Sequence, residues 1–442
     1  MKMVLPKDVQ NIIATLQMNG HEAYAVGGCV RDCVLGKEPN DWDITTSAKP
    51  EAVKALFERT IDTGIEHGTV TIMVGATGYE VTTYRIDGKY EDGRHPTEVT
   101  FTASLEEDLK RRDFTINAMA YNDQDGLVDI FGGMDDLENG IIRAVGNPVE
   151  RFSEDALRML RAMRFAAQLG FEVEADTYDA ICKLAPTLEK VSAERIQVEL
   201  VKLLCSSHPE LIRDTYKSGL TRVFLPEFDR MMETEQNCRH HCYSVGEHTI
   251  KALETVPADK VLRLTMLLHD VAKPNCRRVD EEGKDHFKGH PVVGADMAKE
   301  ILQRLKFDND TIRKVCRLVK YHDERPQINR VDIRKAIVKI GPDAFPQMLD
   351  VKDADIAAQS QYKRESKIEN MKEFRRIYQE IIDEGDCIRM SDMKITGKDL
   401  MSLGLPQGQR IGEVLNALFE RVVEDCSLND HEYLMAEAAK LI

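Results

Sequence analysis

A glycine turn followed closely by two carboxylates constrains the first part of this chain more than any other feature. Residues 27–32 read GGCVRD, and Asp41 and Asp43 follow within a short reach. Alternate residues of a β-strand point to one face, so we expect the two carboxylates side by side on a strand. Such a pair repels itself unless a cation lies between, and Mg²⁺ prefers oxygen ligands that it shares with substrate phosphates.

The residues of the turn itself suit a phosphate group. Gly28 allows the backbone to approach a triphosphate closely, and the Arg31 guanidinium can pair with triphosphate charge. Together with the two carboxylates, the turn predicts a nucleotidyl-transfer site rather than a dinucleotide-binding fold.

The size and composition of the chain fit a protein of several folded modules. Its 442 residues, 42% of them hydrophobic and 31% charged, are typical of a globular protein with about three modules. The sequence contains no apolar run long enough to cross a bilayer, and its first residues lack the apolar region of a signal peptide. Ten cysteines without a disulfide pattern favour a reducing compartment, so we expect a cytoplasmic protein.

The net charge of −16 argues against a general polyanion binder, but affinity for RNA depends on local basic surface. Basic clusters lie at residues 110–112, 313–320 and 330–335. Each cluster taken alone fits a solvated helix face at least as well as an RNA contact.

Strand and helix patterns divide the chain into an α/β head and an all-α remainder. Residues 7–18 predict a helix, residues 23–26 a strand, and residues 69–74 and 79–85 two strands joined by a glycine-containing hairpin. Strand patterns stop soon after residues 139–140, and apolar residues at helical spacing follow. No low-complexity linker separates the modules, so we expect them to pack against one another.

Two further polar blocks follow the glycine turn. In residues 105–118 a basic triplet that ends at Arg112 can neutralise triphosphate oxygens, and Asp113 and Asn117 can orient the phosphates or the sugar. In residues 154–165 we expect a helix with Ser153 as N-cap and Asp155 in its first turn. Three arginines follow at steps of three and should form a stripe beside that carboxylate: Arg158, Arg161 and Arg164.

In these three blocks the chain closely resembles the class II tRNA nucleotidyltransferases, the CCA-adding enzymes and their relatives in the polymerase β superfamily. The matching segments run in order and at the family's spacing: 27–32, 41–43, 79–85, 87–96, 111–118 and 154–165. A weaker match covers residues 396–400 and 410–415. The resemblance implies an α+β protein with a polymerase-β-like nucleotidyltransferase head followed by an all-α neck, body and tail.

The resemblance also implies two-metal nucleotidyl transfer to an RNA 3′-hydroxyl. Two Mg²⁺ ions held by Asp41 and Asp43 would activate the hydroxyl and stabilise the leaving pyrophosphate. Glu80 lies on a predicted neighbouring strand and is a candidate third catalytic carboxylate. The predicted nucleotide-binding residues are Gly28, Arg31, Arg112, Asp113, Asn117, Asp155, Arg158, Arg161 and Arg164.

Selection of C and A without a template has a physical explanation in the third block. Cytosine and adenine both present an amino donor next to a ring-nitrogen acceptor, so Asp155 can accept from the first while Arg158 donates to the second. Uracil and guanine reverse that order and would leave buried polar groups unpaired, at a cost of about 1–3 kcal/mol each. Arg161 and Arg164 would support this pair or contact phosphate.

Three features bear on rival functions. Residues 87–96 resemble the family's flexible loop and favour full CCA addition or A addition over CC addition, although His95 stands where many relatives have arginine. A bacterial poly(A) polymerase shares the head and neck but usually ends in a basic extension. This chain instead ends in a short, acidic segment, residues 432–442. An HD phosphohydrolase with an RNA-binding head would leave the Asp41/Asp43 pair unexplained.

A second group of potential metal ligands lies between residues 240 and 323. His269-Asp270 ends an apolar run that predicts a buried helix, and a His-Asp pair is unusual there unless it binds a metal or is hydrogen-bonded. His and Asp are common ligands of Mn²⁺, Fe, Ni²⁺ and Mg²⁺. The order of the residues resembles the HD metal-dependent phosphohydrolase family, which implies a second divalent metal. Spacing does not choose between His322 and Asp323, and the predicted ligands are His248, His269, Asp270, His290 and Asp323.

These inferences give a four-part chain. The predicted domains are a catalytic head at 1–140, a base-recognising neck at 141–225, an HD-type body at 226–340 and a tRNA-binding tail at 341–442. The expected partners are ATP, CTP and the acceptor and T arms of tRNA, recognised by shape and backbone. No membrane partner is expected, and the oligomeric state is left open.

Overall fold

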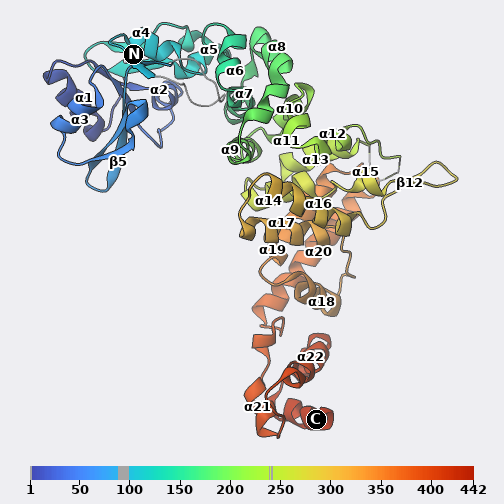
Figure 1. The fold of residues 1–442 in the computed structure, drawn as a ribbon. Helices are drawn as coiled ribbons and strands as arrows, with labels where there is room; N and C mark the ends of the chain where they lie inside the picture. Colours follow the sequence, from blue (N-terminus) through green and yellow to red (C-terminus); the bar gives the residue numbers. More distant parts are fainter. Residues whose placement is uncertain (1, 88–98, 238, 240–241) are drawn as a thin grey trace. The chain divides into compact units, whose positions relative to one another are not determined.

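A computed structural model describes residues 2–87, 99–237, 239 and 242–442. The chain forms two compact units, Met1–Pro226 and Glu227–Ile442. The first unit holds the sheet and the first helices, and the second is almost entirely helical (Figure 1). The protein is therefore of the α+β class, as the sequence predicts.

The first unit contains a seven-stranded sheet among the residues that the structure describes, in the order β3-β4-β5-β2-β1-β8-β9. The strands are β1 (Ala23–Val26), β2 (Asp43–Thr46), β3 (Thr60–Gly64), β4 (Thr69–Val74), β5 (Thr77–Thr83), β8 (Met119–Asn122) and β9 (Gly126–Asp129). Only the β2–β5 pair of this sheet is parallel; the other neighbours are antiparallel. This parallel pair places Asp43 opposite Glu80.

The predicted local elements of the first unit are mostly confirmed. Helix α1 (Lys7–Met18) and strands β1 and β4 have the predicted bounds. Gly75, with a φ of 62°, lies in the turn between β4 and β5, where a left-handed backbone favours glycine. The predicted strand 79–85 is corrected: β5 ends at Thr83, and a separate strand β6 (Arg85–Asp87) pairs with β7 (Val99–Phe101).

Helices cover this sheet and continue beyond it. Helix α1 buries Val9, Ile12, Ile13 and Leu16, which are spaced to form one apolar face. The other helices near the sheet are α2 (Gly28–Val34), α3 (Pro50–Leu56), α4 (Leu105–Lys110) and α5 (Gly133–Asn139). The later helices of the unit are α6 (Pro148–Glu154), α7 (Leu157–Leu169), α8 (Ala175–Leu184), α9 (Ala193–Leu204), α10 (Ile212–Lys217) and α11 (Thr221–Phe224). A short parallel bridge joins β10 (Ile141–Ile142) to β11 (Glu172–Val173).

The predicted helix start at Ser153 is wrong. Helix α6 begins after Asn147, whose side chain accepts from the amide of Val149, and it ends at Glu154. Asp155 then adopts an extended backbone and helix α7 begins at Leu157. A break between two helices, which apolar spacing alone does not reveal, therefore sets Asp155 apart from the arginines that follow.

The second unit is built of packed helices. They are α12 (Pro226–Met232), α13 (Val245–Thr255), α14 (Lys260–Leu268), α15 (Lys273–Cys276), α16 (His290–Arg304), α17 (Asn309–Tyr321), α18 (Arg330–Ile340), α19 (Phe345–Ala358), α20 (Arg364–Asp383), α21 (Gly397–Ser402), α22 (Gln409–Glu424) and α23 (His431–Leu441). A small hairpin joins β12 (Arg278–Val279) to β13 (Asp285–His286). Helix α14 is buried from Val261 to Leu268, as its apolar run predicts.

Two general expectations can be compared with the described residues. None of the helices that the structure describes is long and apolar enough to span a bilayer. The nine cysteines in the described part of the chain are free thiols. The two compact units do not test the division into four domains, which stays a prediction.

Candidate active site

The glycine turn brings two predicted arginines to the start of helix α2. Gly27 has a φ of 82°, and a Cβ atom there would lie 3.0 Å from Nη1 of Arg112. Glycine is thus required both by the backbone and by the close approach of this guanidinium. Arg31 follows one turn later, where its Nη1 donates to Asn117 Oδ1 at 2.8 Å and its Nη2 to Asp32 Oδ1 at 2.7 Å.

Three predicted carboxylates lie together at the β2–β5 pair. Asp43 is the first residue of β2 and stands in register with Glu80 of β5, while Asp41 lies in the bend before β2 rather than on the strand. Asp43 is accessible to solvent, yet desolvation by its surroundings raises the pKa of its carboxyl, Arg112 opposes the rise and Asp41 adds to it. Desolvation and then the charges of Asp43 and Asp41 likewise raise the pKa of Glu80.

Desolvation and neighbouring carboxylates thus disfavour the ionised forms of Asp43 and Glu80, which a cation between the acids would relieve. The donor set consists of solvent-exposed carboxylate oxygens, and this is the chemistry that suits Mg²⁺. Asp41, Asp43 and Glu80 therefore fit the predicted metal site.

A buried carboxylate that the sequence reading missed supports the basic triplet. Asp108 Oδ1 accepts from Nη2 of Arg111 at 2.8 Å, and its Oδ2 lies 3.5 Å from Nη2 of Arg112. Burial opposes ionisation of Asp108, but the two guanidiniums outweigh it and lower its pKa. The signal was present, because an acid three and four residues before two arginines on a helix shares their face.

Two of the predicted nucleotide-binding residues bind each other. Asp113 Oδ2 accepts from Nε and Nη2 of Arg161 at 2.8 and 2.6 Å, and its Oδ1 accepts from Asn117 at 3.2 Å. Burial opposes ionisation of Asp113, but Arg161 and Asn117 lower its pKa to about 2. This bidentate pair links the loop before η2 (Thr115–Asn117) to helix α7.

The remaining residues of the third block have protein partners as well. Nη1 of Arg158 donates to Glu154 at 2.6 Å, and Nε of Arg164 donates to Glu199 at 2.7 Å. Asp155 is paired with Arg195 of α9 at 2.6 Å. Arg195 and Glu199 belong to another helix, 40 and 35 residues along the chain, and no local pattern marks them.

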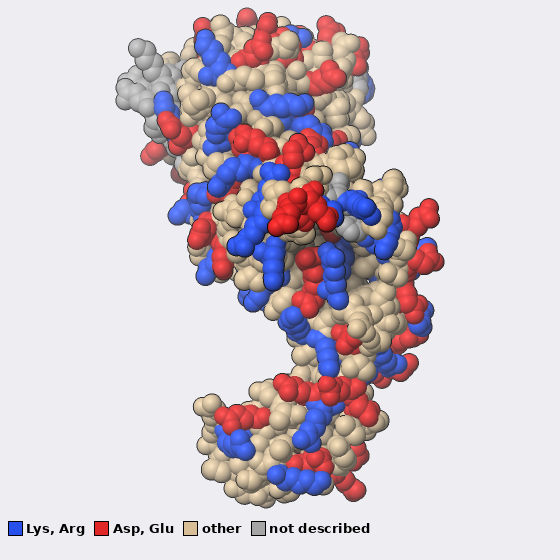
Figure 2. Space-filling model, turned by 90° about the vertical axis from the view of Figure 1, so that its right-hand side faces the viewer, with Lys and Arg blue, Asp and Glu red and all other residues tan. Residues whose placement is uncertain are grey.

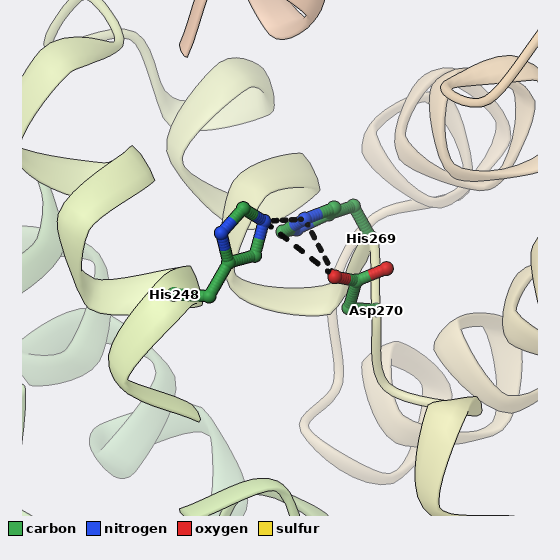
Figure 3. Close-up of side chains that lie close together, drawn as sticks. All are labelled: His248, His269 and Asp270. Atoms are coloured by element: carbon green, nitrogen blue, oxygen red, sulfur yellow. Dashed lines mark hydrogen bonds and ion pairs between the residues drawn. The ribbon is translucent and has the colours of Figure 1, made fainter. Parts of the chain in front are cut away.

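The second unit gathers a cluster of histidines around Asp270. His248 and His269 lie at its Oδ2, at 3.7 and 3.2 Å from their Nε2 atoms, and Figure 3 shows their imidazoles converging on this oxygen. His290 and His322 lie at its Oδ1, at 3.3 and 3.6 Å. All five side chains are buried.

The outer nitrogens of these histidines determine which atom faces inward. Nδ1 of each ring lies within hydrogen-bond distance of a backbone carbonyl, from 2.7 Å for His269 and His322 to 3.3 Å for His248. A carbonyl only accepts, so each Nδ1 carries a proton and Nε2 is the ring atom that faces Asp270. Pairs of Nε2 atoms then lie 3.4 Å apart for His248 and His269 and 3.2 Å apart for His290 and His322, an arrangement that suits metal ligation.

Two corrections follow for the predicted ligands. Asp323 does not join the cluster, since its carboxylate is paired with Arg325 at 2.6 Å near the surface. Its neighbour His322 lies inside instead. Asp355 of α19 was missed, although its Oδ1 lies 2.9 Å from Nε2 of His248.

The buried charges of the cluster stabilise one another. Burial opposes ionisation of Asp270, but His269 and Lys273 hold its pKa well below the usual range. Lys273 Nζ lies 2.7 Å from Asp270 Oδ2, an oxygen that has no hydrogen bond of good geometry. Burial lowers the pKa of His322, which keeps this ring neutral.

A cavity of 820 Å³ opens beside the cluster. Its lining includes Asp270, His290, His322 and Asp355, so the cluster forms part of its wall. Six basic side chains also line it: Lys273, Lys284, Lys288, Arg325, Lys352 and Lys367. Flat and apolar groups complete the wall, among them Phe287, Met371 and Phe374. Acidic side chains line the cavity as well, among them Asp285, Asp323 and Glu324, so its wall is mixed in charge.

The predicted basic clusters of the second unit are largely neutralised. Arg317 is paired with Asp343 at 2.8 Å, and Arg334 is buried against Asp386 at 2.8 Å. Figure 2 nevertheless shows Lys and Arg side chains gathered in the middle of the view, around a compact acidic cluster. The net negative charge is thus compatible with local basic surface.

Comparisons with known proteins agree with this geometry. The family model described as the poly A polymerase head domain matches residues 23–143, and that of a probable RNA- and SrmB-binding site of polymerase A matches residues 170–232. A third, a putative tRNA nucleotidyltransferase domain 2, matches residues 292–438. The CCA-adding enzyme of Ligilactobacillus salivarius (strain UCC118) is 36% identical over 434 residues, which cover 98% of this chain and 95% of the relative. The chain belongs to the CCA-adding enzymes.

Other CCA-adding enzymes match over the same length. That of Leuconostoc mesenteroides is 37% identical over 433 residues, covering 97% of this chain and 94% of the relative. The solved structure of the Bacillus stearothermophilus CCA-adding enzyme in complex with CTP is 28% identical, with a TM-score of 0.71, and covers 99% of this chain and 98% of that one. The predicted family and fold are therefore confirmed, and the protein is a nucleotidyltransferase.

Proposed function

We propose that this enzyme adds C, C and A to the 3′ end of tRNA without a template, using CTP and ATP. The observation that carries the proposal is the register of Asp43 with Glu80 beside Asp41 and the Arg112 guanidinium, in a chain of the CCA-adding family. The related Bacillus stearothermophilus enzyme was solved in complex with CTP, which supports the choice of nucleotide.

Asp41, Asp43 and Glu80 hold Mg²⁺ in this proposal. A bound Mg²⁺ supplies positive charge at the reacting phosphate and at the leaving pyrophosphate. Gly28 opens the backbone to the triphosphate, and Arg31 and Arg112 pair with its oxygens. Asp108 keeps the second of these arginines oriented toward the turn.

The incoming base is read by Asp155 and Arg158. Their protein partners leave each side chain in a defined orientation, Arg195 for the carboxylate and Glu154 for the guanidinium. Asp113, Asn117, Arg161 and Arg164 bond to protein groups, so we assign them to orienting this surface as well as to contacts with the nucleotide.

The domain roles follow the predicted boundaries. The head at 1–140 carries the transfer chemistry, the neck at 141–225 reads the base, and the tail at 341–442 binds tRNA through its acceptor and T arms. The loop at 87–96, which bears on CCA against A-only addition, lies largely outside the described residues.

Incorporation of each labelled NTP into tRNA ending at the discriminator base, at C and at CC tests the proposal. Ordered use of CTP, CTP and ATP is expected. Use of ATP alone on the CC end indicates A-only addition, and a long oligo(A) ladder without CTP use indicates a poly(A) polymerase. Asp41→Asn should abolish incorporation, whereas Asp62→Asn, at an exposed head carboxylate paired with Lys54, should not.

The body carries a second function, metal-dependent hydrolysis of a phosphate ester. Four inward-facing Nε2 atoms and the carboxylates Asp270 and Asp355 would form a donor set for Mn²⁺, Fe, Ni²⁺ or a similar cation. Each oxygen of Asp270 has its own pair of histidines, so these five residues would hold two cations. A bound cation supplies charge for activating water, and the basic side chains of the cavity bind phosphate.

Metal analysis of the purified protein tests this second function apart from the first. We expect two divalent cations per chain in the body and hydrolysis of a simple phosphate ester. A chain that binds no cation after dialysis against Mn²⁺ or Ni²⁺ contradicts the second function and leaves the first intact.

A further inference from the structure

Three guanidinium groups lie over one aromatic ring where the glycine turn meets helix α7. The Cζ atoms of Arg31, Arg161 and Arg164 lie 5.1, 5.3 and 3.6 Å from the centroid of the Phe165 ring. The ring itself is buried, and Phe114 packs edge-on against it with centroids 5.8 Å apart. Cation–π attraction is strongest where water is excluded, as it is here.

The charges around this ring are arranged so that the guanidiniums can share it. Each has its own carboxylate: Asp32 for Arg31, Asp113 for Arg161 and Glu199 for Arg164. Two of these arginines come from the helix that carries Phe165, but Arg31 comes from the glycine turn, 134 positions earlier in the sequence. The ring is therefore a direct contact between the triphosphate side of the site and the base-reading helix.

The other contacts of Arg31 lie in the plane of its guanidinium group and leave the faces of that plane to the ring. Asp32 is its sequence neighbour and Asn117 accepts a single hydrogen bond from it. Neither contact involves the face of the guanidinium plane, which is the part that an aromatic ring supports.

We propose that Phe165 is a positioning residue for the triphosphate, and that its ring holds Arg31 in the orientation that receives the nucleotide. The inference rests on the proposed role of Arg31 as a triphosphate ligand. Arg31 contacts a part that CTP and ATP share, so loss of the ring should raise KM for both nucleotides alike. It should leave kcat, and the discrimination against UTP and GTP, nearly unchanged, because Asp155 and Arg158 remain in place. Arg161 and Arg164 also keep their carboxylate partners, Asp113 and Glu199.

The test replaces Phe165 with mono-, di- and trifluorinated phenylalanine by site-specific incorporation. Fluorination withdraws charge from the ring face and changes its shape little, so a cation–π role predicts a stepwise rise in KM for both nucleotides. Phe165→Leu should raise KM about tenfold. Phe224→Leu, at a buried phenylalanine of α11 in the same unit, is the matched control and should leave KM unchanged.

A double-mutant cycle separates an effect through Arg31 from a general loss of packing. Arg31→Gln alone should raise KM, and adding Phe165→Leu should raise it little further, because the ring acts through that guanidinium. Additive effects, or a flat response across the fluorinated series, overturn the inference. If Arg31→Gln itself leaves KM unchanged, the proposed role of Arg31 fails as well, so the two failures are distinguishable.

Discussion

The two candidate metal sites of this chain differ in ligands, burial and origin. The head site is a row of accessible carboxylates with guanidiniums beside it, whereas the body site is a buried set of imidazoles around one carboxylate. An open oxygen site leaves room for substrate phosphates to complete the coordination of a hard cation. An imidazole-rich site supplies most ligands from the protein and suits a transition metal.

The two sites are also assembled differently. Asp43 and Glu80 meet because strands β2 and β5 are hydrogen-bonded in register. Asp41 lies two residues before Asp43. The body cluster draws on residues from α13 to α19, and His248 and Asp355 are 107 positions apart. A site like that of the head is assembled from short segments, whereas a site like that of the body forms only when several helices pack together.

The largest expected effect separates the two sites. Asp43→Asn should lower CTP incorporation about a thousandfold, because it removes a metal ligand at the reacting phosphate. The metal content of the body should not change. Incorporation into tRNA lacking its CCA end, together with metal analysis, measures both quantities. Incorporation near the wild-type level would contradict the role of Asp43 as a metal ligand and with it the comparison of the two sites.

The reciprocal change addresses the body. Asp270→Asn should weaken metal binding at least about a hundredfold, because this carboxylate contacts both pairs of histidines. Asp323→Asn is the matched control and should retain the metal, since Asp323 is paired with Arg325 outside the cluster. CTP incorporation should survive in both variants. Equal loss of metal in the two variants would restore the ligand set predicted from sequence.

A smaller effect concerns the pH dependence of the head unit. The pKa of Asp113, about 2 in the folded chain, lies below its ordinary value of 3.8, so this group stabilises the fold above pH 4 and loses that contribution as pH falls toward 2. The contribution is about 2 kcal/mol at neutral pH. The difference in unfolding free energy between the wild type and Asp113→Asn should therefore shrink on acidification. Denaturant titrations at several pH values measure it, and a constant difference would contradict the assignment.

The smallest effect concerns base selection. Arg195→Gln should reduce discrimination against UTP about tenfold, since Asp155 loses the partner that fixes its carboxylate. Arg195→Lys should retain part of the discrimination. Competition between CTP and UTP on tRNA ending at the discriminator base measures the ratio. An unchanged ratio with a raised KM would assign Arg195 to nucleotide binding instead.

Much of the head could be predicted from sequence because its determinants are local. Helix α1, strands β1 and β4 and the glycine turn follow from spacing or backbone requirements within a few residues. The Asp41/Asp43 spacing predicts one strand for both acids, but Asp41 lies in the bend before β2. The strand pattern also predicts that Glu80 lies on a strand next to the acids, and the pairing of Asp43 with Glu80 agrees with this. Where a helix break intervened, as between Glu154 and Leu157, the same reasoning placed Ser153 and Asp155 wrongly.

The sequence by itself determined which chemical groups are available: the paired acids, the arginine series and the His-Asp motif. Tertiary structure decided their partners. It paired Asp155 with Arg195, joined Asp113 to Arg161, placed His322 rather than Asp323 in the body cluster and added Asp355 from a distant helix. The physical reason is that periodicity fixes the face of one element, whereas the contact between two elements depends on how their buried surfaces pack.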